Sequence, residues 1–520
     1  MNTARRKWMV TAVALATFMT YLDNNIVNVA LPAIQRQLHL SVAGLEWVVS
    51  GYILVFAGLL LVGGRLADAF GRRRLFLTGL AIFTAASLAA GLAGSVGLLV
   101  ASRAVQGLGA ALVIPTTLAV ISATFAGARE RNSAVGAVSA VGALALALGP
   151  LLGGLISQHL SWGWIFFVNV PVGAATIALG AWAIPESREA RARHLDLPGL
   201  ATSAAALFTL TYALIEGSRL GWTSPMIIGL FAAAALAGVG FVLVEARTAD
   251  PMVAVALFRE RVFAGGSISL MMWAFGLFGI YFFTSLYLQD VLGFSPTKAG
   301  LAFVPMALLI AIGAIASERV ARGIGAHRSV GIAMVVMAAG IASVSLLGRN
   351  TSFLDLMPSF AAIGIGGGLT TPLIATVLGV MPPEQAGVAS GIFNASREAA
   401  GLFGITMIGA ILTARQAFEL RHGHSAATAF LSGYQIGLLV AAVLVAFGGL
   451  AAWLALRQTR QTRHTDPAVT HVAPLQPHPA ESLSLSGSGS GSGVVAAATG
   501  GTEMPEAGVA IAAGALTGPG

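Results

Sequence analysis

The fold can be inferred from the stretch Gly64-Arg-Leu-Ala-Asp-Ala-Phe-Gly-Arg-Arg-Arg74, because the chain contains a diverged second copy of it. That copy is Glu318-Arg-Val-Ala-Arg-Gly-Ile-Gly-Ala-His-Arg328. Both copies lie between long apolar runs. The offset is 254 residues, from 319 minus 65, and four pairs of residues are identical at that offset: Arg65 and Arg319, Ala67 and Ala321, Gly71 and Gly325, Arg74 and Arg328. A repeat of this length predicts two related membrane halves with an insert between them.

The composition places the chain in a lipid bilayer. Hydrophobic residues make up 56% of the 520 residues, charged residues make up 10%, and the mean hydropathy is +0.84, which excludes an ordinary soluble protein. The chain has no cysteine, so disulfide scaffolds, thiolate zinc sites and cysteine nucleophiles are excluded. Because the spans contain no metal-ligand cluster, catalytic-triad spacing or cofactor loop, we expect no enzyme activity, no cofactor and no metal.

The net charge of +8 is mostly arginine, since Lys7 and Lys298 are the only lysines. In a soluble chain this balance would indicate nucleic acid. Here the arginines gather in short loops between apolar runs, where they orient a membrane protein, so the expected partner is the lipid bilayer and no nucleic acid. The arginine-rich loops fall on one side, which predicts that both termini are cytoplasmic in a plasma membrane, and the Arg, Ala and Gly bias favours a bacterial genome.

About fourteen spans of roughly 20 apolar residues fit the chain, because a helix rising 1.5 Å per residue needs that many to cross a bilayer core. The predicted fold class is an all-α polytopic membrane protein, with two six-helix bundles built as inverted repeats and two inserted central helices. The predicted parts are a cytoplasmic N-terminus at 1–7, a first bundle at 8–184, a linker with the inserted helices at 185–261, a second bundle at 262–456 and a disordered cytoplasmic tail at 457–520.

Two opposite charges lie at similar depth inside predicted spans. Asp23 is about eight residues, roughly 12 Å, below the outer end of span one, and Arg103 is about five residues, roughly 8 Å, below the outer end of span four. A charge inside a bilayer needs a partner or an aqueous cavity. Protonation of Asp23 would weaken such a pair and alter helix packing, so this carboxylate is a candidate proton carrier. A purely structural ion pair is the alternative.

The loop from Gly64 to Arg74 is also a candidate conformational latch. Gly64 and Gly71 allow a tight turn and close helix approach, while Asp68 can pair with Arg72 or Arg73, or accept from helix N-terminal amides. The alternative is that these arginines only set the topology.

Glycines recur along span five, where Gly136 is followed by Gly149, Pro150 and Gly153. Small residues permit close packing, and the Gly-Pro pair permits bending. The alternative is ordinary packing without a part in a transport cycle.

Span thirteen carries Arg397 and Glu398 near its middle. Adjacent residues project about 100° apart on a helix, so at most one of them can point squarely into a central cavity. Glu398 is a candidate second proton site or cation contact, or else it pairs with a neighbouring helix.

In combination these motifs resemble the fourteen-span drug:proton antiporters of the major facilitator superfamily, the EmrB/QacA type, over about residues 8–456. The span-one signature matches Leu22 to Pro32 except at Asn25, and the loop signature matches Gly64 to Arg74 except at Ala69. The other matches fall in spans four and five and before span six: Arg103, Gln106 and Gly107; Gly136, Gly149, Pro150 and Gly153 with Ala145 in place of a glycine; and Trp162 to Gly173 except at Gly163.

The resemblance implies a major facilitator fold that works by alternating access. Asp23 and Arg103 would couple inward proton flow to the export of small amphipathic or cationic drug-like compounds, antibiotics among them, and the transporter would work as a monomer. No Gly-x-x-x-x-Gly-Lys loop is present, so ATP drive is not supported. The predicted cavity wall combines polar and aromatic side chains: Asn24, Gln106, Trp273, Tyr281 and Asn394.

Two other functions remain open. A facilitator-fold exporter of an endogenous metabolite or lipid would carry the same motifs, and a substrate panel would distinguish it. A transport-inactive membrane sensor would tolerate neutralisation of Asp23 and Arg103.

Overall fold

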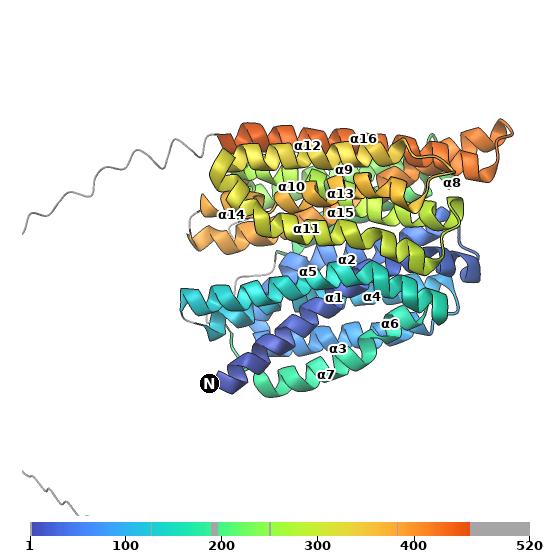
Figure 1. Cartoon of the computed structure of the whole chain (residues 1–520). Helices are drawn as coiled ribbons and strands as arrows, with labels where there is room; N and C mark the ends of the chain where they lie inside the picture. The colour runs from blue at the N-terminus through green and yellow to red at the C-terminus, as the bar shows by residue number, and fades with distance from the viewer. Residues whose placement is uncertain (1–2, 126, 189–195, 249–250, 382, 458–520) are drawn as a thin grey trace, which may run out of the picture. The chain divides into compact units, whose positions relative to one another are not determined.

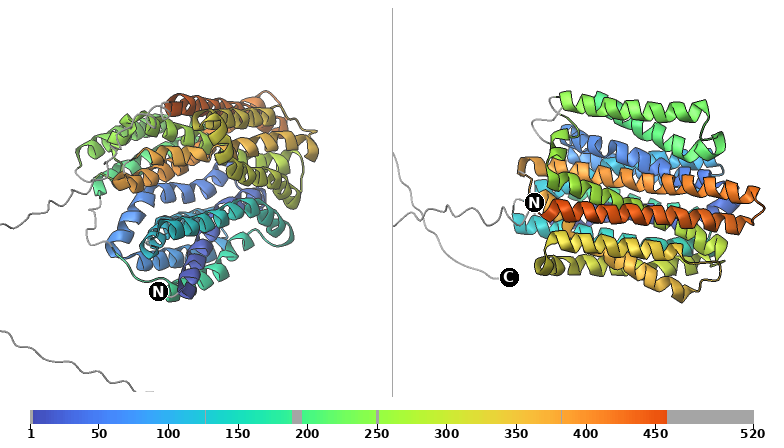
Figure 2. Two further views of the ribbon diagram at one scale, coloured as in Figure 1. Left: turned by 60° about the vertical axis from the view of Figure 1, so that its left-hand side comes forward. Right: turned by 90° about the horizontal axis from the view of Figure 1, so that it is seen from above.

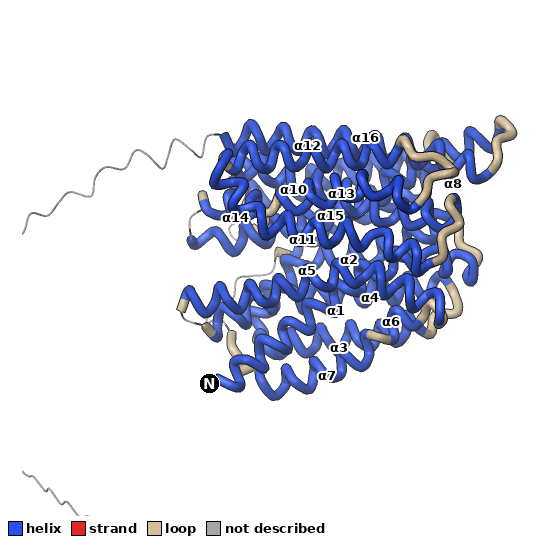
Figure 3. Tube along the Cα trace, in the orientation of Figure 1, coloured by secondary structure: helices blue, strands red, loops and turns tan. Residues whose placement is uncertain are grey.

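The computed structural model describes residues 3–125, 127–188, 196–248, 251–381 and 383–457, and these ranges contain helices and loops but no strand (Figure 3). The predicted tail lies outside the described residues, apart from residue 457. The N-terminal part contains α1 (Thr3–Leu38), α2 (Val42–Phe70), α3 (Arg72–Gly91), α4 (Val96–Thr124), α5 (Ala128–His159), α6 (Trp164–Phe167) and α7 (Asn169–Ala183).

The inserted helices come next, and the C-terminal part follows them (Figure 1). The insert consists of α8 (Leu197–Leu220), α9 (Pro225–Arg247) and the short 3-10 helix η1 (Val255–Arg259). The C-terminal part contains α10 (Arg261–Leu286), the π-helical turn η2 (Tyr287–Val291), α11 (Pro296–Ile324), α12 (Ala326–Ser345), α13 (Phe353–Leu369), α14 (Pro372–Gly379), α15 (Pro383–Arg421) and α16 (Ala426–Leu456).

Within the described ranges, 13 helical segments are long and apolar enough to cross a membrane. α1 is long enough at 36 residues, but Asp23, Asn24, Asn25 and Asn28 lower the hydropathy of its middle. A bilayer helix tolerates such residues when they face protein, and α1 packs against α5 and α7. α1 is therefore needed to complete the predicted fourteen spans.

The sequence repeat forms the same turn twice. Gly71 follows α2 with a φ of 106°, and Gly325 follows α11 with a φ of 88°; glycine adopts this left-handed range without a steric penalty. The N–H of Gly71 donates to the carbonyl of Ala67 at 3.1 Å, and that of Gly325 donates to the carbonyl of Ala321 at 2.9 Å. Each turn leads directly into the next helix, so the repeated sequence encodes a repeated helix-turn-helix unit.

The helix packing repeats as well (Figures 1 and 2). In the N-terminal part, α4 packs on both α2 and α3. Helix α7 packs on both α1 and α3, and α1 also packs on α5. In the C-terminal part, α13 packs in the same way on both α11 and α12. Helix α16 packs on both α10 and α12, and α10 also packs on α15. The two halves therefore share one internal arrangement. The exact boundaries of the predicted parts stay a prediction.

The inserted helices lie beside the contact between the halves. α8 packs on α9, α2 and α15, and Figure 2 shows α8 and α9 in green at the edge of the helices. The outward side of α9 carries exposed apolar side chains, as a lipid-facing helix requires: Leu236, Val239 and Leu243.

Two equivalent helix contacts join the halves, α2 with α15 and α5 with α11. The second depends on glycine: a Cβ on Gly154 would come within 3.1 Å of the Thr297 Cα, and one on Gly300 within 3.3 Å of the Leu151 Cα. We call the end of the molecule with the loops after α2, α4, α7 and α11 the arginine end. At the opposite end Gln289 Nε2 donates to the Val29 carbonyl at 2.9 Å, across the contact between the halves.

Candidate functional site

A buried ion pair joins α1 to α4. Asp23 Oδ2 lies 2.5 Å from Arg103 Nη1, and both side chains have an exposed fraction of 0%. The structure thus brings together the two residues whose depths agree in the sequence. Desolvation of two charges is costly, and removal of either one would leave the other buried without its partner.

The other oxygen of Asp23 is held by two amide side chains. Oδ1 accepts from Gln106 Nε2 at 3.1 Å and from Asn169 Nδ2 at 2.8 Å, and Gln106 Nε2 also reaches Ser87 Oγ at 2.7 Å. Helices α1, α4 and α7 therefore meet at one carboxylate, and α3 is linked to it through Gln106. Sequence reasoning missed Asn169, although it lies inside the Trp162 to Gly173 motif, where a single polar side chain in an apolar run was the available signal.

The Arg103 side chain also has contacts that do not involve Asp23. Its Nε donates to the Val48 carbonyl at 3.2 Å, and its guanidinium carbon lies 4.5 Å from the ring centroid of Tyr52 and 5.6 Å from that of Phe166. Aromatic faces attract a cation by about 0.5–2 kcal/mol each. The guanidinium therefore keeps favourable contacts if the carboxylate beside it becomes neutral.

The second charged pair lies on α15. Arg397 Nη2 is 2.6 Å from Glu398 Oε1, and the exposed fractions of the two side chains are 19% and 3%. Arg397 lines the cavity described below together with Tyr21, while Glu398 turns inward, within electrostatic range of Tyr52. The ion-pair partner of Glu398 is the adjacent arginine of its own helix, which differs from the predicted alternative of a pair with a neighbouring helix. Whether Glu398 binds a proton stays a proposal.

A cavity of about 870 Å³ lies between the halves and reaches the arginine end. α1, α2, α4 and α5 line one side, and α15 lines the other. The polar lining at the mouth consists of Arg65, Asp68, Arg131 and Asn132, and that deeper in the cavity includes Thr17, Tyr21, Asn394 and Arg397. The halves are joined at the opposite end, so within the described residues this cavity opens toward the arginine end.

Of the predicted wall residues, Asn394 lines this cavity, and the others require correction for this conformation. Gln106 is fully buried in the network around Asp23. Tyr281 stacks on Phe303 with 5.2 Å between ring centroids, and Trp273 Nε1 donates to the Gly367 carbonyl at 3.3 Å. Asn24 is half-buried, outside the lining. Because α10 packs on α15 and α16, its aromatic side chains fill the C-terminal half instead of facing the cavity.

The loop between α2 and α3 is held within the N-terminal half. Asp68 Oδ1 accepts from Arg72 Nη2 at 2.9 Å, whereas Arg73 donates its backbone N–H to Glu186 Oε1 at 3.2 Å and its Nη2 to the Ala181 carbonyl. Gly71 leaves room for Glu186, because a Cβ there would come within 2.9 Å of the carboxyl carbon. Gly64 and Asp68 both line the cavity mouth, so a latch between the halves at this loop would form only when that mouth closes.

The span-five motif lies where α5 contacts two other helices, α1 and α11. A Cβ on Gly149 would come within 2.7 Å of Asn25 Cβ, and one on Gly153 within 3.2 Å of Ile26 Cγ1, both on α1. On the other side of α5, the Pro150 carbonyl lies against Gly300 of α11. Gly136 differs from these residues, since nothing lies within 4 Å of its added Cβ. The close-packing prediction therefore fits Gly149 and Gly153 but not Gly136 in this conformation.

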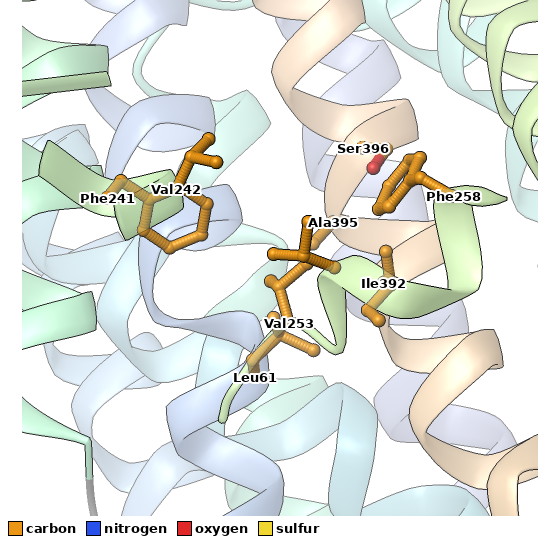
Figure 4. A pocket seen from close by; sticks show the side chains of 9 residues that line it. Leu61, Phe241, Val242, Val253, Phe258, Ile392, Ala395 and Ser396 are labelled. Carbon is orange, nitrogen blue, oxygen red and sulfur yellow. The ribbon is translucent and has the colours of Figure 1, made fainter. Parts of the chain in front are cut away.

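A second, apolar cavity of about 360 Å³ lies where α9 and the linker meet α2 and α15 (Figure 4). Leu61 of α2 lines both this cavity and the larger one. The remaining lining is mostly aliphatic or aromatic: Phe241, Val242, Val253, Val255, Phe258, Ile392, Ala395 and Ser396. The inserted helices thus add an apolar side pocket next to the central cavity.

A repeated membrane fold with a central cavity open at one end and buried charges beside it defines a secondary transporter. The chain belongs to the Major Facilitator Superfamily, whose family model matches residues 13–405.

Curated relatives include a puromycin resistance protein of Streptomyces alboniger, 35% identical with 91% of this chain and 95% of the relative covered. A cephamycin export protein of Amycolatopsis lactamdurans is also 35% identical, with 91% and 97% covered. A multidrug resistance protein of Mycobacterium tuberculosis is 36% identical, with 78% and 75% covered.

Solved structures share the fold at low identity. A bacterial homologue of the human lysosomal transporter Spinster, in an inward-facing and unoccupied conformation, has a TM-score of 0.63 at 16% identity, with 88% of this chain and 98% of that chain covered. An auto-inhibited peptide transporter of the POT family has a TM-score of 0.65 at 18% identity, with 89% and 99% covered.

Proposed function

We propose that this protein is a proton-driven exporter of drug-like amphipathic compounds in a bacterial plasma membrane, with both termini in the cytoplasm. The observation that carries the proposal is the buried Asp23–Arg103 pair beside a cavity open at one end. Relatives covering more than nine-tenths of the chain are named for antibiotic resistance and antibiotic export, which supports export over uptake.

The proposed cycle uses the pair as a charge switch. With the cavity open to the cytoplasm, a compound enters past Asp68 and Arg131, and the two bundles then rock to expose it outside. A proton from outside adds to the Asp23 carboxylate, which removes the negative charge facing Arg103 and loosens the contact between α1 and α4. Release of that proton to the cytoplasm restores the pair, so one direction of proton flow supports the opposite movement of the compound.

The charges of the residues that line the cavity indicate which compounds it would accept. Three arginines, Arg65, Arg131 and Arg397, and one acid, Asp68, line the described part of the cavity, while Asp23 is fully buried outside it. With the ion-pair partners Glu398 and Arg72 included, the balance is four arginines against two acids. A cation entering this cavity therefore meets more positive than negative charge. We propose that neutral and acidic amphipathic compounds are preferred to cationic ones.

The test uses everted vesicles whose interior is acidified. Neutral, acidic and cationic antibiotics and dyes are added, and proton release is compared between the native protein and Asp23→Asn. The matched control is Asp355→Asn, because Asp355 Oδ2 accepts from the Ser352 backbone N–H at 2.8 Å at an exposed helix start, and the amide oxygen of asparagine can accept the same bond. Compound-dependent release that is lost in Asp23→Asn alone supports the proposal.

Two results would favour the alternatives. If no drug-like compound causes proton release but a cell extract does, the result would favour an exporter of an endogenous metabolite or lipid. Undiminished cellular activity after neutralising both Asp23 and Arg103 would favour a sensor that does not transport.

A further inference from the structure

A second carboxylate, that of Glu46 near the start of α2, is buried in the contact between the halves. Glu46 is 1% exposed, and its Oε2 has no hydrogen-bond partner among the described residues. It lies one turn from the start of α2, at the end opposite to the arginine end. None of the ion pairs within the described ranges includes it.

Glu46 is pressed against the other half of the protein. A Cβ on Gly409 of α15 would come within 2.8 Å of Glu46 Oε2, so glycine is what allows α15 to cover the carboxyl group. One turn further toward the arginine end, Ser50 of α2 and Thr406 of α15 are also fully buried with hydroxyls that lack described partners. The α2–α15 contact is therefore polar at this level, and its most costly member is Glu46.

The neighbouring charges do not neutralise Glu46. Glu216 of α8 is the one described charged group that acts on it, and that carboxylate is occupied by Arg219 at 2.6 Å and by Trp47 Nε1 at 3.0 Å. The other charged groups on the outer part of the surrounding helices have partners of their own: Arg103 with Asp23, Arg397 with Glu398, Arg415 and His424 with Glu419, and Arg36 with Asp290. Arg421 and His422 contact backbone carbonyls of α15. Of the tyrosines, Tyr212 packs against Trp47, Tyr52 lies under Arg103, and Tyr21 lines the central cavity. The charged residues of α3 lie at the arginine end. His39, in the loop before α2, is exposed.

An ionised carboxylate without a cation or donors is strongly disfavoured inside protein. We propose that Glu46 is a proton-binding site of the outer gate: it is neutral while α2 and α15 are closed over it, and it ionises when they separate. This inference rests on the proposed alternating-access function, because that function requires the α2–α15 contact to open on the outer side.

The site would act as a lock without carrying net charge across the membrane. As the outer gate closes, the Glu46 carboxylate takes one proton from the external solution; as the gate reopens, the carboxylic acid returns that proton to the same side. Net coupling remains with Asp23. The closed gate holds one more proton than the open gate, so rising pH favours opening, by up to about tenfold in the closed-to-open ratio per pH unit.

The first test is infrared spectroscopy of the purified full chain in lipid at neutral pH. We expect the carbonyl stretch of a protonated carboxylic acid, shifted by carbon-13 labelling of glutamate and absent in Glu46→Gln. Glu419→Gln is the matched control, since Glu419 is a buried glutamate of the same end that is paired with Arg415. Equal acid-carbonyl intensity in the native protein and Glu46→Gln would overturn the proposal, and transport activity does not enter this readout.

The second test follows the gate and needs no change at Glu46. The chain lacks cysteine, so spin labels can be placed at Ala43→Cys on α2 and Ala417→Cys on α15, in an Asp23→Asn background that removes the proposed coupling group. We expect the long-distance population to grow as pH rises, and Glu46→Gln to abolish that growth. A gate that opens and closes but ignores pH would refute the role of Glu46 alone, whereas a gate that never opens would refute alternating access.

Discussion

Asn169 Nδ2 lies 2.8 Å from Oδ1 of Asp23, so the first residue of α7 holds the carboxylate that α1 contributes to the buried pair. Gln106 and Arg103 of α4 approach the same carboxylate. Because donors from two further helices converge on it, a change in the charge of Asp23 is felt by α4 and α7 together. That is the property required of a group that couples proton binding to helix movement.

Replacement of Asn169 by alanine should weaken the protein. The change leaves the buried Asp23 Oδ1 with one donor in place of two, and a lost hydrogen bond to a buried charged group costs about 1.5–3 kcal/mol. Thermal unfolding of the purified protein measures the loss. Asn28→Ala is the control, because Asn28 is also buried on a membrane helix, and the one hydrogen bond of its side chain within the described ranges is a long one, 3.5 Å to the Asn24 carbonyl. An equal loss in both variants would contradict the prediction.

Arg103→Leu should destabilise the protein more than the double variant Asp23→Leu with Arg103→Leu. The single change strands a buried carboxylate, at a cost of about 3–5 kcal/mol, whereas removal of both charges is often near neutral. Thermal stability and export are measured side by side. We expect the double variant to recover stability but not proton-driven export; recovery of export as well would assign the pair a structural role only.

Bulk at Gly154 should block the inward-open conformation. A side chain there would collide with Pro296 and Thr297 of α11 and hold the halves apart at the end opposite to the arginine end. We expect Gly154→Val to lose export, with the spin-label distance across that end increased. Gly136→Val is the control in the same helix, because its Cβ has open space, and comparable inactivation by both changes would contradict the packing argument.

Neutralising the pair on α15 should change the charge preference of export. The double variant Arg397→Gln with Glu398→Gln keeps the site neutral and removes the one cation of the deep cavity lining among the described residues. A charge-assisted hydrogen bond contributes about 1.5–3 kcal/mol, so affinity for acidic compounds should fall about tenfold or more. Binding is measured for matched acid and methyl-ester pairs, and an equal change for both members would exclude Arg397 as a charge-selecting contact.

Gly71→Ala should be more harmful than Gly221→Ala. Both glycines have positive φ, at 106° and 89°, and alanine in such a conformation costs roughly 1–2 kcal/mol. At Gly71 the added Cβ also meets the Glu186 carboxyl group, whereas at Gly221 the nearest atom is 4.0 Å away. Thermal unfolding of the two variants measures the loss of stability. Equal losses would show that the backbone strain at positive φ accounts for the effect and that the contact with Glu186 adds nothing.

The fold class, the repeat and the depth-matched charges could be predicted from the amino-acid sequence, because these features follow from local rules. Apolar runs fix which segments cross the bilayer, glycine fixes the two equivalent turns at Gly71 and Gly325, and a charge inside a span demands a partner.

The way in which the helices face each other could be learned from the folded chain alone. Side-chain direction around a helix depends on its neighbours, so Asn169 joins the pair, Tyr281 and Trp273 turn into the C-terminal half, and Gly136 packs against nothing. Glu46 shows the same limit: its place in the sequence says only that it begins a span, and its burial without a cation arises because Gly409, more than 360 residues later, brings α15 over it.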